Sequence, residues 1–195
     1  KSKDFRMHVV RSFDVNKPGT SPEDIRGGVI GGSIITGTLK VGEKIEISPG
    51  DNGKPMHTEV VSLGVEGGRL EEAGAGGLIA VGTTLDPFYT KNDEMRGQLV
   101  ARLGVLPAPV TLVRMEVKPL ERLLVDKKGG ELKVNDLVVL AVGTTTAIGQ
   151  VSRLAGKGEL EFRLRTPVIV EKGMQVAISK KETTGWRLRA YGICK

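Results

Sequence analysis

The sequence has 195 residues, of which 39% are hydrophobic and 27% are charged, and its formal net charge is +6 at pH 7. These proportions are ordinary for a globular protein and exclude a disordered chain. No apolar run reaches the roughly 18 residues that a membrane helix needs. The single cysteine, Cys194, excludes an intramolecular disulfide and is typical of a reducing, cytoplasmic location.

Short runs of alternating apolar and polar residues recur along the whole chain, and Gly, Pro and Asn separate them. This pattern predicts an all-β protein built as sandwiches or barrels. The strands that we expect cover residues 7–13, 44–48, 58–63, 98–103, 111–117, 137–142, 160–164, 175–179 and 187–193.

Residues 14–50 carry the most specific pattern in the sequence. Glycine pairs flank β-branched residues in GGVIGGSIIT at 27–36, which predicts a sharply twisted backbone that another molecule can approach closely. A β-hairpin closed at KVGEK, residues 40–44, is expected to follow. Before the glycine pairs, Ser21 and Pro22 predict one short helical turn, because they suit the N-cap and the first helical position.

Two prolines in LPAP, residues 106–109, interrupt the strand pattern, because proline cannot donate to a central ladder. We therefore predict two domains, 1–107 and 108–195. The first has 13 basic and 14 acidic residues, and the second has 16 and 9. The basic second half is expected either to attract RNA phosphates or to present an ordinary solvated face. Residues 119–125 are compatible with a second helical turn or with strand and loop.

No catalytic, cofactor-binding or metal-binding residues are expected. Asp14, Asp86 and Asp93 lie in loop-like contexts without a coupled histidine or acid, and their side chains are expected to bond nearby backbone amides. The two histidines have no second ligand at metal spacing. GDNGKP at 50–55 has the wrong glycine spacing for a phosphate loop, and Pro55 stands where the magnesium-binding hydroxyl is needed.

Several separated motifs occur in the order known from one family: RSFDVNKPGT at 11–20, GGVIGGSI at 27–34, GGLIAVGTTLDP at 76–87, TKND at 90–93, RGQL at 96–99 and GWRLRAYG at 185–192. By these motifs the chain resembles the gamma subunit of archaeal and eukaryotic translation initiation factor 2, a relative of elongation factor Tu. The resemblance implies two consecutive closed β-barrels of the elongation-factor-Tu domain II and domain III type. It also implies a fragment, because the nucleotide domain of the family has no counterpart here.

The resemblance implies a factor that uses GTP and Mg²⁺ to deliver initiator methionyl-tRNA to the small ribosomal subunit, together with alpha and beta subunits. These two barrels would be a tRNA- and subunit-binding scaffold in the cytoplasm, with no cofactor and no enzymatic activity of their own and no membrane partner. Two alternatives stay open. One is another tRNA-delivery GTPase, of the selenocysteine-specific elongation factor type, and the other is a purely structural interaction module.

The resemblance also implies two sites on the first barrel. The residues expected to form a groove for the tRNA 3′ end are Arg26, Gly28, Val29, Ile30, Gly31, Gly32, Val81, Gly82, Thr83 and Arg96. The residues expected to dock the alpha subunit, on a different side, are Asn16, Lys17, Asp86, Lys91 and Asp93. Val29, Ile30 or Val81 would supply an apolar slot for the terminal base, so their exposure separates an RNA groove from a purely structural barrel. The loop at 49–55 is short for the family, which argues against an alpha-subunit contact there.

Overall fold

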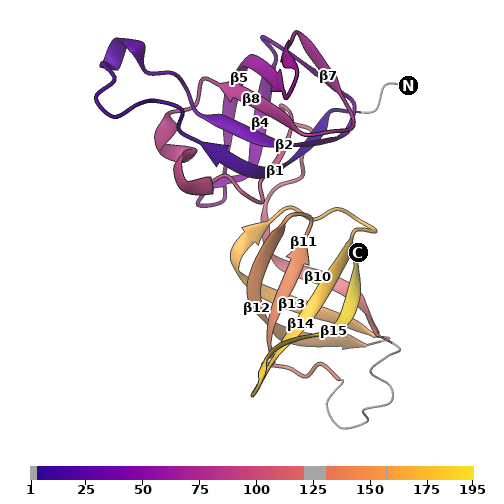
Figure 1. The fold of residues 1–195 in the computed structure, drawn as a ribbon. Coiled ribbons are helices and arrows are strands. Elements are labelled where there is room, and N and C mark those ends of the chain that lie inside the picture. The colour runs from indigo at the N-terminus through magenta and orange to yellow at the C-terminus, as the bar shows by residue number, and fades with distance from the viewer. Residues whose placement is uncertain (1–3, 121–130, 157) are drawn as a thin grey trace. The chain divides into compact units, whose positions relative to one another are not determined.

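The structure is a computed structural model that describes residues 4–120, 131–156 and 158–195. The chain divides into two compact units, Lys1–Leu106 and Pro107–Lys195. Both are built of antiparallel strands (Figure 1). Each unit has its own hydrophobic core.

The first unit is a barrel whose main strands form a closed ring, with three short strands outside the ring among the described residues. Going round the ring, the strands are β4 (Lys44–Asp51), β9 (Leu99–Arg102), β1 (Arg6–Phe13), β2 (Val29–Thr36), β8 (Ile79–Thr83) and β5 (Lys54–Val65). Pairing between β4 and β5 closes the ring. The short strand β6 (Gly68–Leu70) pairs antiparallel with the end of β5. Strand β3 (Thr38–Lys40) pairs with β7 (Glu72–Gly74) in a separate two-stranded sheet.

Alternation along the strands places one face of each inside this barrel. Met7 and Val9 of β1, Ile30 of β2 and Val81 of β8 are each 0% exposed. Burying such a side chain stabilises the fold by about 1.5–3 kcal/mol. The inward face is therefore fixed by the core and is closed to any ligand.

The prediction of a β-hairpin closed at residues 40–44 is wrong, because the strands on the two sides of this turn do not pair with each other. A turn does occur there, with Gly42 at φ +85°, but the strands on its two sides belong to different sheets. Strand β3 pairs with β7, while β4 pairs with β5 and β9. The N–H of Gly42 donates to the carbonyl oxygen of Val60 at 2.7 Å, which draws the turn onto β5.

The second unit is a closed barrel around a core that contains Phe162, which is 0% exposed. Its strands, in ring order, are β10 (Val110–Pro119), β13 (Glu159–Val168), β12 (Thr145–Gly156), β11 (Leu137–Val142), β14 (Gln175–Glu182) and β15 (Gly185–Cys194). Burial raises the pKa of the Cys194 thiol. Of the ambiguous residues 119–125, Pro119 ends β10, and 121–125 lie outside the described residues.

The predicted all-β class and the closed barrels are confirmed. Within the described ranges, helix is limited to three single 3₁₀ turns: η1 (Pro22–Asp24), η2 (Pro87–Tyr89) and η3 (Lys91–Asp93). The predicted turn near Ser21 is η1. Across the described part of the chain, no helix has the length and apolar character to span a membrane.

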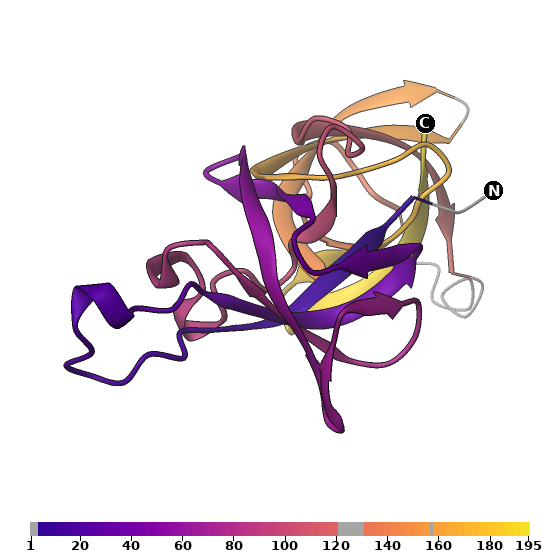
Figure 2. The same cartoon turned by 90° about the horizontal axis from the view of Figure 1, so that it is seen from above.

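Two irregular segments stand out beside the strands of the first barrel. The loop between β1 and β2, which carries η1, stands away from the barrel in Figures 1 and 2. In both views, the segment with η2 and η3 lies beside the base of this loop. The two segments therefore project side by side from the barrel.

Candidate functional site

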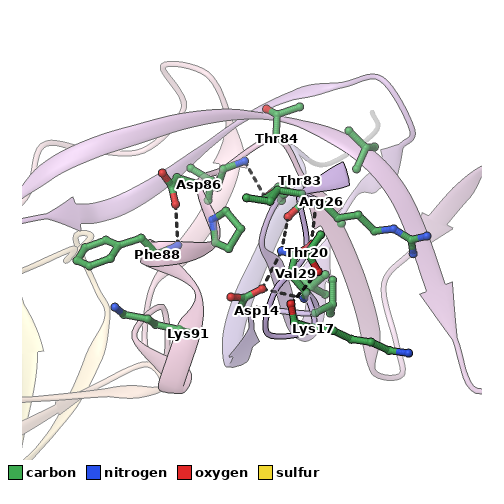
Figure 3. A pocket seen from close by; sticks show the side chains of 18 of the residues that line it. Asp14, Lys17, Thr20, Arg26, Val29, Thr83, Thr84, Asp86, Phe88 and Lys91 are labelled. Carbon is green, nitrogen blue, oxygen red and sulfur yellow. Dashed lines mark hydrogen bonds between the residues drawn. The ribbon is translucent and has the colours of Figure 1, made fainter. Parts of the chain in front are cut away.

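An open groove of about 1410 Å³ lies on the first barrel between the β1–β2 loop and the η2 segment (Figure 3). Its floor comes from strands β2, β5 and β8, and β6 contributes Arg69. The groove is lined by Asp14, Val15, Asn16, Lys17, Pro18, Gly19, Thr20, Pro22, Ile25, Arg26, Gly27, Val29, Val61, Ser62, Arg69, Gly82, Thr83, Thr84, Leu85, Asp86, Pro87, Phe88 and Lys91.

The side chain of Asn16 fixes one wall of the groove, the β1–β2 loop. Its Oδ1 accepts from the N–H of Arg26 at 2.8 Å, and its Nδ2 donates to the carbonyl oxygen of Arg26 at 2.8 Å. The same Nδ2 donates to Asp14 Oδ1, also at 2.8 Å. The amide therefore bridges the two arms of the loop as a paired strand would, and it holds the loop in one shape.

The opposite wall is the turn η2, which Asp86 caps. Its Oδ1 accepts from the N–H of Phe88 at 2.8 Å, a local bond that satisfies a free amide at the start of the turn. Phe88 is 61% exposed, and Lys91 Nζ lies 3.9 Å from the centre of its ring. Tyr89 packs edge-on against the same ring, at 5.6 Å between centroids. The exposed ring is thus held in place by its neighbours.

Thr90 joins the two walls. It is 0% exposed, and its Oγ1 donates to the carbonyl oxygen of Phe13 at 2.9 Å, where the β1–β2 loop begins. Its side chain fills the space beside Gly28, at the other end of that loop, where a Cβ would overlap Thr90 Oγ1. Because Thr90 touches both ends of the loop and follows η2 directly, the walls are positioned relative to each other.

Asp93 anchors the η3 segment to strand β1. Its Oδ1 accepts from the N–H of Ser12 and from Arg11 Nε, each at 2.9 Å. The Ser12 amide first, and the Arg11 guanidinium second, hold the pKa of the Asp93 carboxyl below its ordinary value of 3.8. The carboxylate therefore contributes to the fold of this segment.

This anchor predicts a pH-dependent effect of Asp93→Asn. Because the folded-state pKa is lowered, the contribution of the carboxylate is complete above pH 3.8 and is lost as the pH falls through the folded-state value. We expect the variant to be less stable than the wild type at pH 7 and the difference to shrink below pH 3.8. The unfolding free energies of the variant and the wild type, measured from pH 7 to below pH 3.8, test this prediction. Glu94→Gln is the control at pH 7, where we expect its stability to equal that of the wild type. A difference that stays constant down to the lowest pH would contradict the anchor.

The residues predicted for the tRNA groove separate into buried and accessible ones. Ile30 and Val81 are 0% exposed, so their prediction as an apolar slot is wrong: both side chains belong to the barrel core. Gly28, Gly32, Gly82 and Thr83 are also buried, although Gly82 and Thr83 form part of the groove floor. Arg26 and Val29 line the groove, whereas Gly31 and Arg96 lie outside its lining.

Four of the five residues predicted to dock the alpha subunit lie on the same groove as Arg26 and Val29, not on a different side. Asn16, Lys17, Asp86 and Lys91 line it together with Arg26 and Val29. The expectation of two separate sides is therefore wrong for these residues. Asp93 lies outside the lining and serves as an internal anchor. The predicted backbone-bonding role is confirmed for Asp14 and Asp86, whose side chains accept from the N–H of Asn16 and of Phe88.

Besides Val29, which was predicted, the groove has further exposed apolar residues that sequence reasoning missed. Val15, Ile25 and Val61 are 49%, 49% and 51% exposed and line it together with Phe88. The neighbouring prolines Pro18, Pro22 and Pro87 were the available signal, because prolines around isolated apolar residues mark exposed loops. Val61 gave no such signal. A register shift in β5 between Val60 and Ser62 turns Val61 outward.

The groove carries more positive than negative charge. Among the described lining residues, Lys17, Arg26, Arg69 and Lys91 face only two carboxylates, Asp14 and Asp86. Both carboxylates accept local hydrogen bonds. Within the described ranges, no carboxylate pairs with any of the four cations. The groove therefore offers cations and exposed apolar side chains together.

Two family models match separate parts of the chain. The model "Initiation factor eIF2 gamma, C terminal" matches residues 111–194, and "Elongation factor Tu domain 2" matches residues 27–90. Among curated proteins, the chain is 47% identical to translation initiation factor 2 subunit gamma of Pyrococcus furiosus, over 97% of this chain and 49% of that protein. The subunit of Pyrococcus abyssi is 48% identical, and that of Methanopyrus kandleri 42%. The chain spans about half the length of these relatives.

Proposed function

Because the chain belongs to the family of translation initiation factor 2 gamma subunits, we propose that its two barrels bind the factor's alpha subunit and help to carry initiator methionyl-tRNA to the small ribosomal subunit. The first barrel docks the alpha subunit in the groove between the β1–β2 loop and η2. The beta subunit and the ribosome are further partners of the complete factor, which acts in the cytoplasm.

One observation carries the docking proposal: the groove is formed by two irregular segments that hydrogen bonds hold in fixed shapes. Asn16 fixes the first segment, Asp86 caps the second, and Thr90 connects them. A preformed surface loses little entropy on binding, so it suits a stable subunit contact. Phe88 fits the role of an anchor, because it is aromatic, exposed and immobilised by its neighbours.

Arg26 and Val29 line the groove that the alpha subunit occupies in this proposal, so the accessible candidates for RNA are Gly31 and Arg96, which lie outside it. We propose that Gly31 and Arg96 contact the tRNA 3′ end only in the complete protein. The second half of the sequence, with 16 basic and 9 acidic residues, adds attraction for phosphates. GTP and Mg²⁺ serve the full-length protein. The two barrels carry no phosphate-loop motif, so no step of GTP hydrolysis is assigned to their residues.

The docking proposal predicts a large effect of Phe88→Ala. The ring is 61% exposed, so its removal spares the core, but it removes the aromatic anchor on the η2 wall of the groove. We expect affinity for the C-terminal domain of the alpha subunit to fall about 30-fold, corresponding to roughly 2 kcal/mol. Calorimetry with the purified domain measures it.

Leu78→Ala is the matched control, because Leu78 is 73% exposed on the same barrel but does not line the groove. We expect its affinity to equal that of the wild type. If the wild type, Phe88→Ala and Leu78→Ala all bind with equal affinity, the alpha subunit binds at a site other than the groove. Absence of any binding would favour a purely structural module.

A further inference from the structure

We propose that the groove recognises an acidic, apolar-bearing segment of a partner polypeptide, so that carboxylates of the partner meet Lys17, Arg26 and Arg69 while its apolar side chains cover Phe88 and Val61. This inference rests on the proposed docking function and adds the chemistry of the segment that docks.

Charge is the first argument. Within the part of the chain that the structure describes, Lys17, Arg26 and Arg69 line the groove without a carboxylate partner, and they come from both the β1–β2 loop and β6. In Figure 3, the side chains of Lys17 and Arg26 extend to the same side, away from Phe88 and Lys91. Cations distributed in this way complement several carboxylates along one extended segment.

The apolar lining is the second argument. Val15, Ile25 and Val61 are each about half exposed, and Phe88 more so, all within one groove. Isolated exposed apolar residues are common, but a group that shares a groove with unpaired cations marks an interaction site. A partner segment that carried carboxylates alone would leave these side chains in water. The complementary segment therefore has both acidic and apolar residues.

An RNA end fits the groove less well. Single-stranded RNA is held by aromatic rings on which bases stack, together with cations that track the backbone. Phe88 is the only aromatic residue among the described lining residues. One face of its ring is covered by Lys91 Nζ at 3.9 Å, and Tyr89 packs against it edge-on. The remaining apolar side chains are aliphatic, which suits a polypeptide better than a base.

The first test measures affinity for the C-terminal domain of the alpha subunit at two salt concentrations. The groove variant is Lys17→Glu with Arg69→Glu, and the matched control is Lys44→Glu with Lys54→Glu, which are exposed on the same barrel outside the groove lining. We expect the groove variant to bind about 100-fold more weakly at low salt and the loss to shrink at high salt. The control is expected to change affinity by less than about 3-fold. If the alpha-subunit domain binds the wild type, and the groove variant binds it as tightly as the control variant does, the inference fails while the docking function stands.

The second test is independent of the alpha subunit. A synthetic peptide of alternating Glu, Leu and Phe is compared with its Lys counterpart and with a single-stranded RNA tetranucleotide, by following backbone amide signals of the ¹⁵N-labelled chain. We expect the acidic peptide alone to shift the signals of groove residues. If the acidic peptide shifts the amide signals of groove residues but the alpha-subunit domain does not bind, the docking function is overturned and the inference is supported. If the RNA or the Lys peptide shifts the amide signals of groove residues and the acidic peptide does not, the inference is overturned.

Discussion

Replacing Gly32 by alanine should unfold the first barrel at far lower denaturant than the wild type. Gly32 is buried on β2, directly opposite β1, and a Cβ there would overlap the carbonyl oxygen of His8. Main-chain atoms in the middle of a ladder cannot move aside cheaply, because β1 is bonded to β9 on its other edge. We expect a loss of at least about 3 kcal/mol. Hydrogen exchange of β1 and β2 amides measures this loss.

Gly31→Ala is the matched control, one residue away on the same strand. The nearest heavy atom to its Cβ would be a side-chain carbon of Phe13 at 3.6 Å, an ordinary contact. We expect stability to change by less than about 1 kcal/mol. Trp186, the only tryptophan in the sequence, lies in β15, so its fluorescence reports the second barrel separately. Equal effects of the two alanine substitutions would contradict the packing of β2 against β1.

The second large effect is expected for Val81→Asp. Val81 is 0% exposed in the core of the first barrel, where a carboxylate would have no partner. Burying an unpaired charge is among the few changes that cost more than about 4 kcal/mol, so the barrel should be largely unfolded. Circular dichroism and hydrogen exchange of β8 amides test this result.

Val29→Asp is the corresponding outward change. Val29 is half-buried on β2 and lines the groove, so the carboxylate stays in contact with water. We expect the barrel to keep its fold, with a loss within about 1 kcal/mol for the weaker strand propensity of aspartate. A folded Val81→Asp variant with ordinary exchange protection would return Val81 to the surface and restore it as a candidate for the RNA groove.

Strands whose inward side chains are large could be predicted from the sequence, even where the register shifts, as in β1 and β5. The predicted strand 137–142 coincides with β11 (Leu137–Val142), where buried and half-buried residues alternate along the whole strand. Strand β12 was missed, because its inner face includes the small Ala147 and the position of Gly149, which carry little apolar signal. Alternation is visible only when the inward side chains are large.

Which face of a strand points inward could not be predicted where the register shifts. The β1–β2 pair shifts between Val9 and Arg11, and the β5–β8 pair shifts between Val60 and Ser62. Each shift changes which side chains face the core. The sequence therefore indicated both Val29 and Val81 as candidates for an apolar slot. It did not indicate that Val29 points outward while Val81 points into the core.

The groove depends on contacts between distant residues, which no local pattern reveals. Asp93 binds Ser12 and Arg11, and Thr90 binds Phe13, across about eighty intervening residues. The sequence predicted that alpha-subunit docking takes place on a different side from the RNA groove, at Asn16, Lys17, Asp86, Lys91 and Asp93. That four of these residues line one groove, while Asp93 lies outside its lining and anchors η3 to β1, follows only from the way the barrel closes.

The central claim is that the groove of the first barrel docks the alpha subunit. Its most direct test is to titrate the ¹⁵N-labelled chain with the C-terminal domain of the alpha subunit and to record which backbone amides change their signals. We predict changes concentrated in the β1–β2 loop, in η2 and around Val61 and Arg69, with β10 to β15 unaffected. Changes confined to the second barrel, or saturable binding that leaves the groove amides unchanged, would contradict the claim.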